Sequence, residues 1–150
     1  MAKMRQRLFL ATRSILLGWA TLLPAAYLLE RPILVLIAAR LGPSWFPTVR
    51  LMLDCSLLAG IGWMIGHLGS SDPILAVGAF ATTLSFWDLG ELVEIRMPWL
   101  LELARNALRD PRYWDSFVYT AVIQIVLFGS LVVGALLSRR APATAALSIR

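Results

Sequence analysis

Four long stretches of apolar residues, separated by short polar segments, dominate the pattern along the chain. They run from about Leu8 to Leu29, Leu51 to Gly69, Ile74 to Ile95 and Ser116 to Ser138. A helix needs roughly 20 apolar residues to cross the ~30 Å hydrocarbon core of a bilayer, and each stretch has about that length. The pattern therefore predicts an all-α integral membrane protein, built as a single domain with a bundle of four transmembrane helices.

Two of the connecting segments have the pattern of short helices. From Pro98 to Arg109, apolar and polar residues occupy opposite faces at helical spacing, which predicts an amphipathic helix in the membrane interface. The segment from Arg31 to Arg40 is apolar on every side but too short to cross, so we interpret it as an interfacial or re-entrant helix. The alternative is an extension of the first span, which would bury Glu30 and Arg31 at roughly 2.5–3.5 kcal/mol for a central charge.

Composition supports the membrane class. Hydrophobic residues make up 59% of the 150 residues and charged residues 15%, whereas an average soluble domain has about 25% charged residues. A soluble chain of this size could not bury so much apolar surface in one core. A disordered chain needs low hydrophobicity, and the single Cys55 excludes a disulfide within the chain.

Charge distribution indicates how the chain is oriented. The short segment from Gly69 to Pro73 predicts a tight turn, and four spans place both termini on one side of the membrane. Seven basic residues fall on each side, but the terminal side has only Asp72 as an acid, against eight acids opposite. This asymmetry favours cytoplasmic termini, and the arginine-rich composition suggests a bacterial inner membrane. The bases are scattered without a face of stacking aromatics, so we expect no nucleic-acid partner.

Acidic residues near the end of the third stretch are the main candidates for chemistry. Asp88 begins a set of three carboxylates at three-residue spacing, which spreads over one helix face. Asp54 lies about 5 Å inside the second stretch, at the same membrane side, because the two stretches form a hairpin. Carboxylates inside a bundle mark ion or proton pathways; alternatively, they form an acidic helix end at the headgroups, paired with arginines. The pathway candidates are Asp54, Asp88, Glu91 and Glu94, with Arg50 and Arg96 as charge partners.

The remaining reactive side chains do not combine into a catalytic or cofactor site. His67, the only histidine, follows Asp54 by 13 residues and so lies about 20 Å from it along one helix. Cys55 lies in apolar surroundings, where a thiol is inert, and Gln124 is the only strongly polar residue within the fourth stretch. The sequence contains no glycine-rich phosphate loop, no Cys/His metal spacing and no internal repeat. We therefore expect no catalytic residue, no metal and no cofactor.

Small residues at four-residue spacing predict close helix contacts, either within the chain or between chains. The helix-packing candidates are Gly62, Gly66, Ser130 and Gly134, and Ser56 and Gly60 precede the first pair at the same spacing. Tryptophans in the segments opposite the termini fit an aromatic belt at the membrane surface. These interfacial anchors are Trp45, Trp99 and Trp114.

Three functions remain open at this level. The first is a small, non-enzymatic subunit or assembly partner of a membrane complex, in contact with the lipid bilayer and forming a homo-oligomer or binding other membrane subunits. The second is an oligomeric proton- or cation-coupled transporter or channel that uses Asp54 and Asp88, with Glu91 at its mouth. The third is an intramembrane enzyme acting on lipid or quinone. We favour the first, because the chain is small and its segments outside the spans are short.

Overall fold

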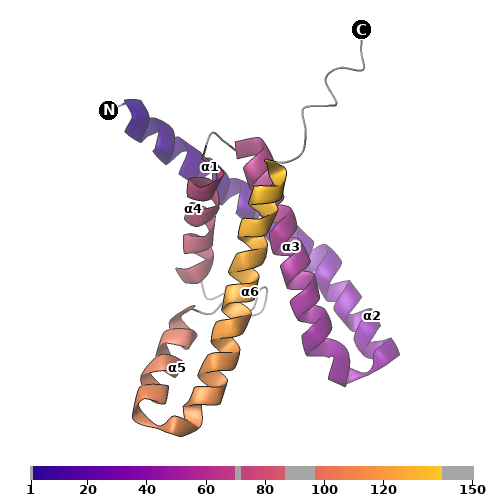
Figure 1. The fold of residues 1–150 in the computed structure, drawn as a ribbon. Coiled ribbons are helices and arrows are strands. Elements are labelled where there is room, and N and C mark those ends of the chain that lie inside the picture. The colour runs from indigo at the N-terminus through magenta and orange to yellow at the C-terminus, as the bar shows by residue number, and fades with distance from the viewer. Residues whose placement is uncertain (1, 70–71, 87–96, 140–150) are drawn as a thin grey trace.

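The computed structural model describes residues 2–69, 72–86 and 97–139, and all regular elements in these ranges are helical (Figure 1). This confirms the all-α prediction. The turns named η are a π-helical turn (η1) and two 3₁₀ turns (η2 and η3). In chain order the elements are α1 (Ala2–Ala25), η1 (Ala26–Glu30), α2 (Arg31–Leu41), η2 (Pro43–Trp45), α3 (Phe46–Gly69), α4 (Pro73–Phe86), α5 (Met97–Arg109), η3 (Pro111–Tyr113) and α6 (Trp114–Ser138).

Three helical runs among the described residues are long and apolar enough to cross a membrane. They are Lys3–Ile37, Phe46–His67 and Pro111–Ser138, and they correspond to the first, second and fourth predicted spans. The third predicted span is described only as far as residue 86, where a shorter apolar helix covers Pro73–Ser85.

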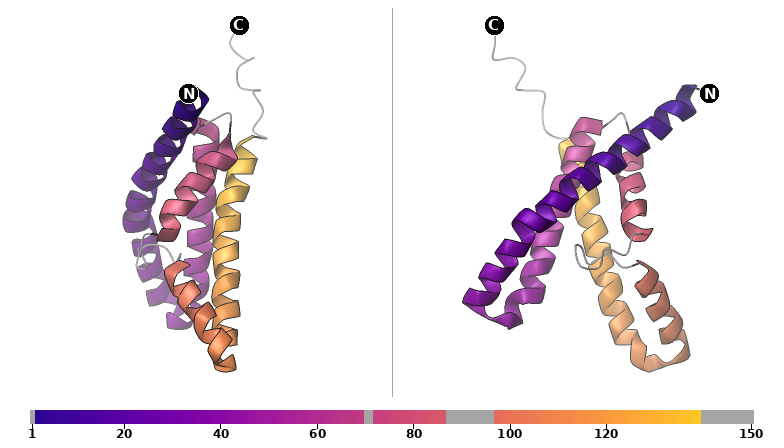
Figure 2. Two further views of the ribbon diagram at one scale, coloured as in Figure 1. Left: turned by 90° about the vertical axis from the view of Figure 1, so that its left-hand side faces the viewer. Right: turned by 180° about the vertical axis from the view of Figure 1, so that it is seen from behind.

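A π-helical turn joins α1 to α2 into one long helical run, seen from behind in Figure 2. Pro32 lacks an amide hydrogen, and its ring clashes with the carbonyl four residues earlier, so a regular α-helix cannot continue through this point. The amide of Arg31 instead donates to the carbonyl of Ala26, five residues back, which is the π-helical pattern. The segment after Glu30 therefore continues the first helix, the geometry of the extension alternative considered above.

The order of elements repeats once along the chain. α2 is followed by Gly42, the three-residue turn η2 and the long helix α3, and α5 is followed in the same way by Asp110, η3 and α6. Gly42 has a φ of 88°, which glycine adopts without strain. Asp110 accepts a hydrogen bond from the amide of Arg112 at 3.0 Å, which caps η3. The repetition is one of backbone arrangement, since no repeat is visible in the sequence.

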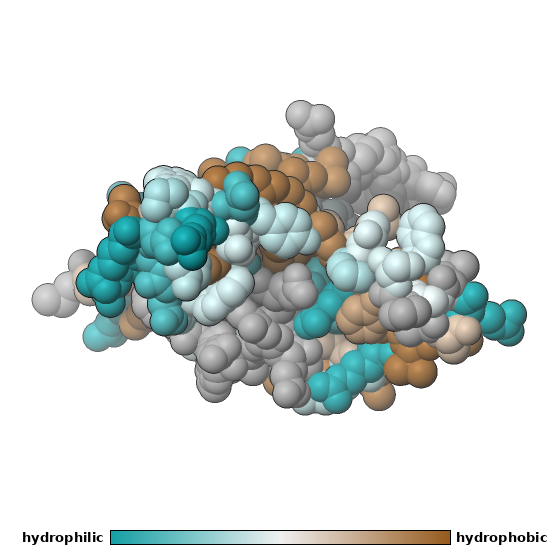
Figure 3. All heavy atoms as spheres, turned by 90° about the horizontal axis from the view of Figure 1, so that it is seen from below, coloured by the Kyte–Doolittle hydropathy of each residue, from teal (hydrophilic) through white to brown (hydrophobic). Residues whose placement is uncertain are grey.

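The start of α1 and the end of α6 lie at one end of the molecule, which we call the terminal end (Figure 1). η2 and η3 lie at the opposite end, which we call the turn end. α3 and α6 both run from the turn end to the terminal end, whereas α1–α2, α4 and α5 run the other way. Seen from the turn end, hydrophilic side chains gather on the side of α5 and η3 (Figure 3).

Close packing of α3 against α6 forms the centre of the structure. A β-carbon on Gly62 would overlap the carbonyl oxygen of Leu131, and one on Gly134 would overlap the carbonyl of Ala59. Gly66 also lies against the backbone of α6. Contacts within the chain therefore account for these glycines, whereas the Ser130 hydroxyl donates to a carbonyl of its own helix.

One row of buried residues on each of the two helices alternates spacings of four and three, which is the seam of a coiled coil. They are Asp54, Leu58, Ile61 and Ile65 on α3, and Thr120, Gln124, Leu127, Leu131, Gly134 and Ser138 on α6. The charged and amide residues of this seam lie toward the turn end, and apolar residues follow toward the terminal end as far as Ser138.

The other helices pack around this pair. α1 crosses α4 where Gly18 lies against the ring of Phe80, and the indole nitrogen of Trp19 donates to the Thr83 hydroxyl at 3.1 Å. α5 contacts α6 and buries Leu103 and Ala107. Its extent, Met97–Arg109, matches the amphipathic helix expected at 98–109.

We expect the Gly62→Ala substitution to destabilise the protein by about 1–3 kcal/mol, because the added methyl group overpacks the α3–α6 contact. Gly60→Ala is the matched control, since a β-carbon there meets no atom within 4 Å. Alanine favours helix over glycine by up to about 1 kcal/mol, so the control gains stability or stays unchanged. Thermal unfolding in detergent measures both, and equal behaviour of the two variants contradicts the close contact.

Candidate functional site

Four polar side chains inside the helix core form the candidate site, which we call the buried polar layer. Asp54 is 0% exposed, Gln124 is 4% exposed and Glu30 is 6% exposed. Arg50 is partly buried beside them. The layer comprises Glu30 from η1, Arg50 and Asp54 from α3, and Gln124 from α6.

Helix geometry brings these residues to one level. Arg50 and Asp54 are four residues apart and so share a face of α3. The contacts of Gly62 with Leu131 and of Gly66 with Ala135 each join residues 69 apart. Applied to Asp54, the same offset reaches Ile123, and the next residue along α6 is the buried Gln124.

An ion pair ties the first helical run to α3. Arg50 Nε lies 3.9 Å from Glu30 Oε1, and the π-helical turn ends at Glu30, which is buried. Charges in a low-dielectric interior are costly unless they are paired and hydrogen-bonded. Each of the four side chains in the layer has an interaction partner. The layer therefore contains two buried carboxyl groups, one partly buried guanidinium and one buried amide, drawn from three elements.

The structure places the predicted charged residues as follows. Asp54 and Arg50 belong to the layer. α3 begins at Phe46, so Asp54 lies about 12 Å along it, deeper than the sequence predicts. The candidates Asp88, Glu91, Glu94 and Arg96 lie outside the described residues.

Sequence reasoning did not predict two members of the layer. In the sequence, Glu30 stands out only as a charge that an extended first span would bury, and Gln124 only as the one strongly polar residue of an apolar stretch. Glu30, next to Arg31, and Gln124 both interrupt long apolar runs, and this interruption is the signal that the sequence offers. The residues that each of them meets could not be predicted, because the sequence does not show how the helices align with one another.

The remaining predicted residues lie apart from the layer. All three predicted anchors are exposed: Trp45 in η2, Trp99 near the start of α5 and Trp114 at the start of α6. Their location at a membrane surface stays a prediction. His67 stacks on Trp63 at a ring-centroid distance of 5.1 Å on the exposed side of α3. Within the described ranges, no three His, Cys, Asp or Glu side chains are grouped so that they could hold a metal ion.

We expect the Arg50→Met substitution to destabilise the protein by about 3–5 kcal/mol, because it leaves the buried Glu30 carboxylate without this partner. The double variant Glu30→Leu with Arg50→Met is less destabilised than the sum of the two single variants. Arg40→Met, at an exposed position on α2, is the control and changes stability by less than about 0.5 kcal/mol. Unfolding in mixed micelles measures the stability of the two single variants and the double variant. Stability changes that add strictly in the double variant contradict the ion pair.

Comparison with protein-family models, with curated proteins and with solved structures finds no match to this chain. Its function is therefore inferred from the arrangement of its own residues. The strongest features are the buried polar layer, the glycine contacts between α3 and α6, and the outward faces of those helices.

Proposed function

We propose that the chain is a membrane protein that crosses the bilayer four times and acts as a non-enzymatic subunit of a membrane complex. The parallel direction of α3 and α6 supports four crossings, because the chain between two parallel spans must return across the bilayer. α4 and α5 both run in the returning direction. The basic residues at the terminal end then favour a cell membrane with cytoplasmic termini.

The observation that carries the subunit role is a stripe of small residues on the outward side of α3. Ser56 and Gly60 are exposed, and a β-carbon on Gly60 would meet no atom within 4 Å. Exposed Met52 and Trp63 flank them. Small residues four apart let a second helix approach closely in lipid, and the inward pair, Gly62 and Gly66, is already occupied by α6.

The partner helix can belong to a second copy of this chain or to another membrane subunit, and both fit the proposal. Polar contacts would add little at this face, because the Ser56 hydroxyl donates to the carbonyl of Met52 within its own helix at 2.8 Å. Association would therefore rest on van der Waals contact between helix surfaces. A bulky residue at Gly60 is then the most direct way to prevent it.

We expect Gly60→Leu to abolish association, measured by chemical cross-linking in native membranes and by native mass spectrometry, while the thermal stability of the monomer stays unchanged. Gly129→Leu is the matched control, because Gly129 on α6 is equally open and lies on another face. A protein that is monomeric before substitution and cross-links to no partner contradicts the subunit role. Equal loss of association in both variants contradicts the location of the interface.

A second function, proton- or cation-coupled transport, is favoured by the burial of Asp54. Ionisable residues inside a span are functional candidates by default, and transporters built from repeated halves place their sites where the repeats meet. Asp54 is buried on α3, the long helix of the first repeated arrangement. α3 packs against α6, the long helix of the second, so Asp54 lies where the two repeats meet. Arg50 on the same face would compete with a bound cation, so reversible proton binding is the more compatible chemistry.

If the chain transports protons, Asp54→Asn abolishes proton flux in proteoliposomes, because an amide side chain cannot bind and release a proton near neutral pH. Gln124→Leu is the companion variant, since it alters the same layer without removing an ionisable group. Flux that is present in the unsubstituted protein and survives Asp54→Asn contradicts this assignment. Circular dichroism confirms that each variant is folded before the flux is compared.

A further inference from the structure

A groove between α1 and α4 at the terminal end combines an apolar floor with one cationic rim residue. It is an open depression of about 540 Å³, not an enclosed cavity. Arg7 contributes the guanidinium, and the remaining lining is apolar or small except for Thr82. The lining residues are Met4, Arg7, Leu8 and Ala11 on α1, and Leu75, Gly78, Ala79 and Thr82 on α4.

A second groove lies on the other side of α4, against α6. It is almost wholly apolar, has a volume of about 150 Å³, and is lined by residues such as Val77, Phe128 and Val132. Gly78 lines both grooves, and a β-carbon there would meet no atom within 4 Å. The absence of a side chain at Gly78 therefore leaves an apolar depression on both flanks of one helix.

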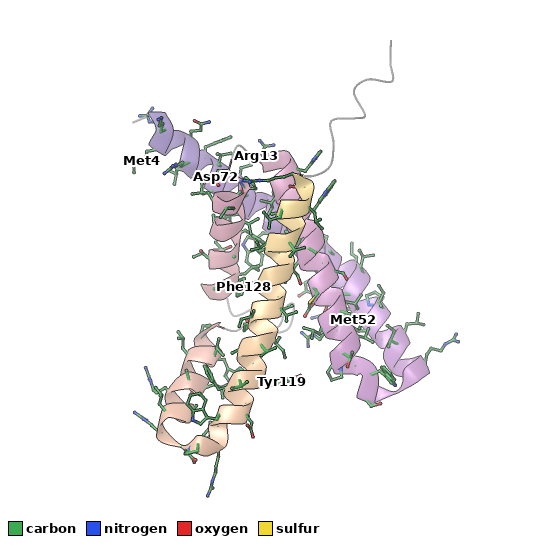
Figure 4. The ribbon with its side chains drawn as sticks, in the orientation of Figure 1. Met4, Arg13, Met52, Asp72, Tyr119 and Phe128 are labelled. Carbon is green, nitrogen blue, oxygen red and sulfur yellow. The ribbon has the colours of Figure 1, made fainter. Side chains whose placement is uncertain are left out.

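Charge at the rim of the first groove favours an anion. Figure 4 shows Met4 and Arg13 on α1 and Asp72 at the start of α4, all at the terminal end. The Asp72 carboxylate is engaged locally, because it accepts a hydrogen bond from the amide of Leu75 at 3.2 Å. Among the described residues, the basic side chains at this end are Lys3, Arg5, Arg7, Arg13 and Arg139.

From these observations we infer that this surface is a binding site for an anionic phospholipid, with its headgroup at Arg7 and its acyl chains along the two grooves beside α4. The apolar floors of the grooves favour acyl chains over a wholly polar ligand, because they offer few hydrogen-bonding groups. The guanidinium binds a phosphate through paired N–H donors, and a basic residue close to a membrane surface attracts anionic lipid. A single apolar helix from a partner would use the grooves but not Arg7.

The inference rests on the proposed membrane insertion, and one experiment separates the two. Purified protein in detergent is titrated with dioleoylphosphatidylglycerol or dioleoylphosphatidylcholine, and bound lipid is counted by native mass spectrometry. We expect tighter binding of the anionic lipid, and Arg7→Gln to weaken it about fivefold without changing binding of the zwitterionic lipid. Gly78→Leu weakens both lipids, because the new side chain fills the grooves.

Two controls make the outcomes decisive. Arg40→Gln removes an exposed charge near the turn end, and Gly129→Leu adds the same bulk at an open glycine elsewhere; neither should alter lipid binding. Equal losses for Arg7→Gln and Arg40→Gln, or unchanged binding by Gly78→Leu, would overturn the site. Extraction of the protein from vesicles by alkaline carbonate would instead overturn the membrane insertion on which the site depends.

Discussion

Close packing of α3 on α6 is the contact on which the remaining structure depends. In lipid no hydrophobic force draws two apolar helices together, so association needs backbones that approach closely. Gly62, Gly66 and Gly134 permit this approach, and the alternating spacing of buried residues keeps the seam in register. α4 then packs against both long helices, α1 against α3 and α4, and α5 against α6 and α4.

The polar end of the same seam imposes a second constraint, because buried charges must be compensated inside the protein. Arg50 compensates Glu30 across two elements, which fixes where the first helical run meets α3. A polar residue within a coiled-coil seam selects one register at some cost in stability. Asp54 and Gln124 fit that role. The layer that would bind a proton in the transport proposal therefore also serves to fix the register of the two helices.

The sequence predicted the helices well and their contacts poorly, for physical reasons. The length of the apolar stretches predicted three helices that are long enough to cross a membrane, and the helical period of apolar residues predicted α5. Small-residue spacing identified Gly62 and Gly66 but not the direction they face, because α3 carries such residues on two sides. The position of Glu30 depends on the π-helical turn before Pro32 and on its pairing with Arg50. Both follow from tertiary packing, which a linear pattern does not contain.

The parallel register of α3 and α6 is tested most directly by distances between spin labels in lipid nanodiscs, after Cys55→Ser removes the native thiol. Labels replace exposed residues in the pairs Met52 with Val122 and Trp63 with Val133. Both pairs should be close, since packed helices lie about 8–10 Å apart, whereas the pair Met52 with Val133 is displaced by about 16 Å along the axis. A shorter distance for Met52 with Val133 than for the two level pairs would show antiparallel helices and contradict the account.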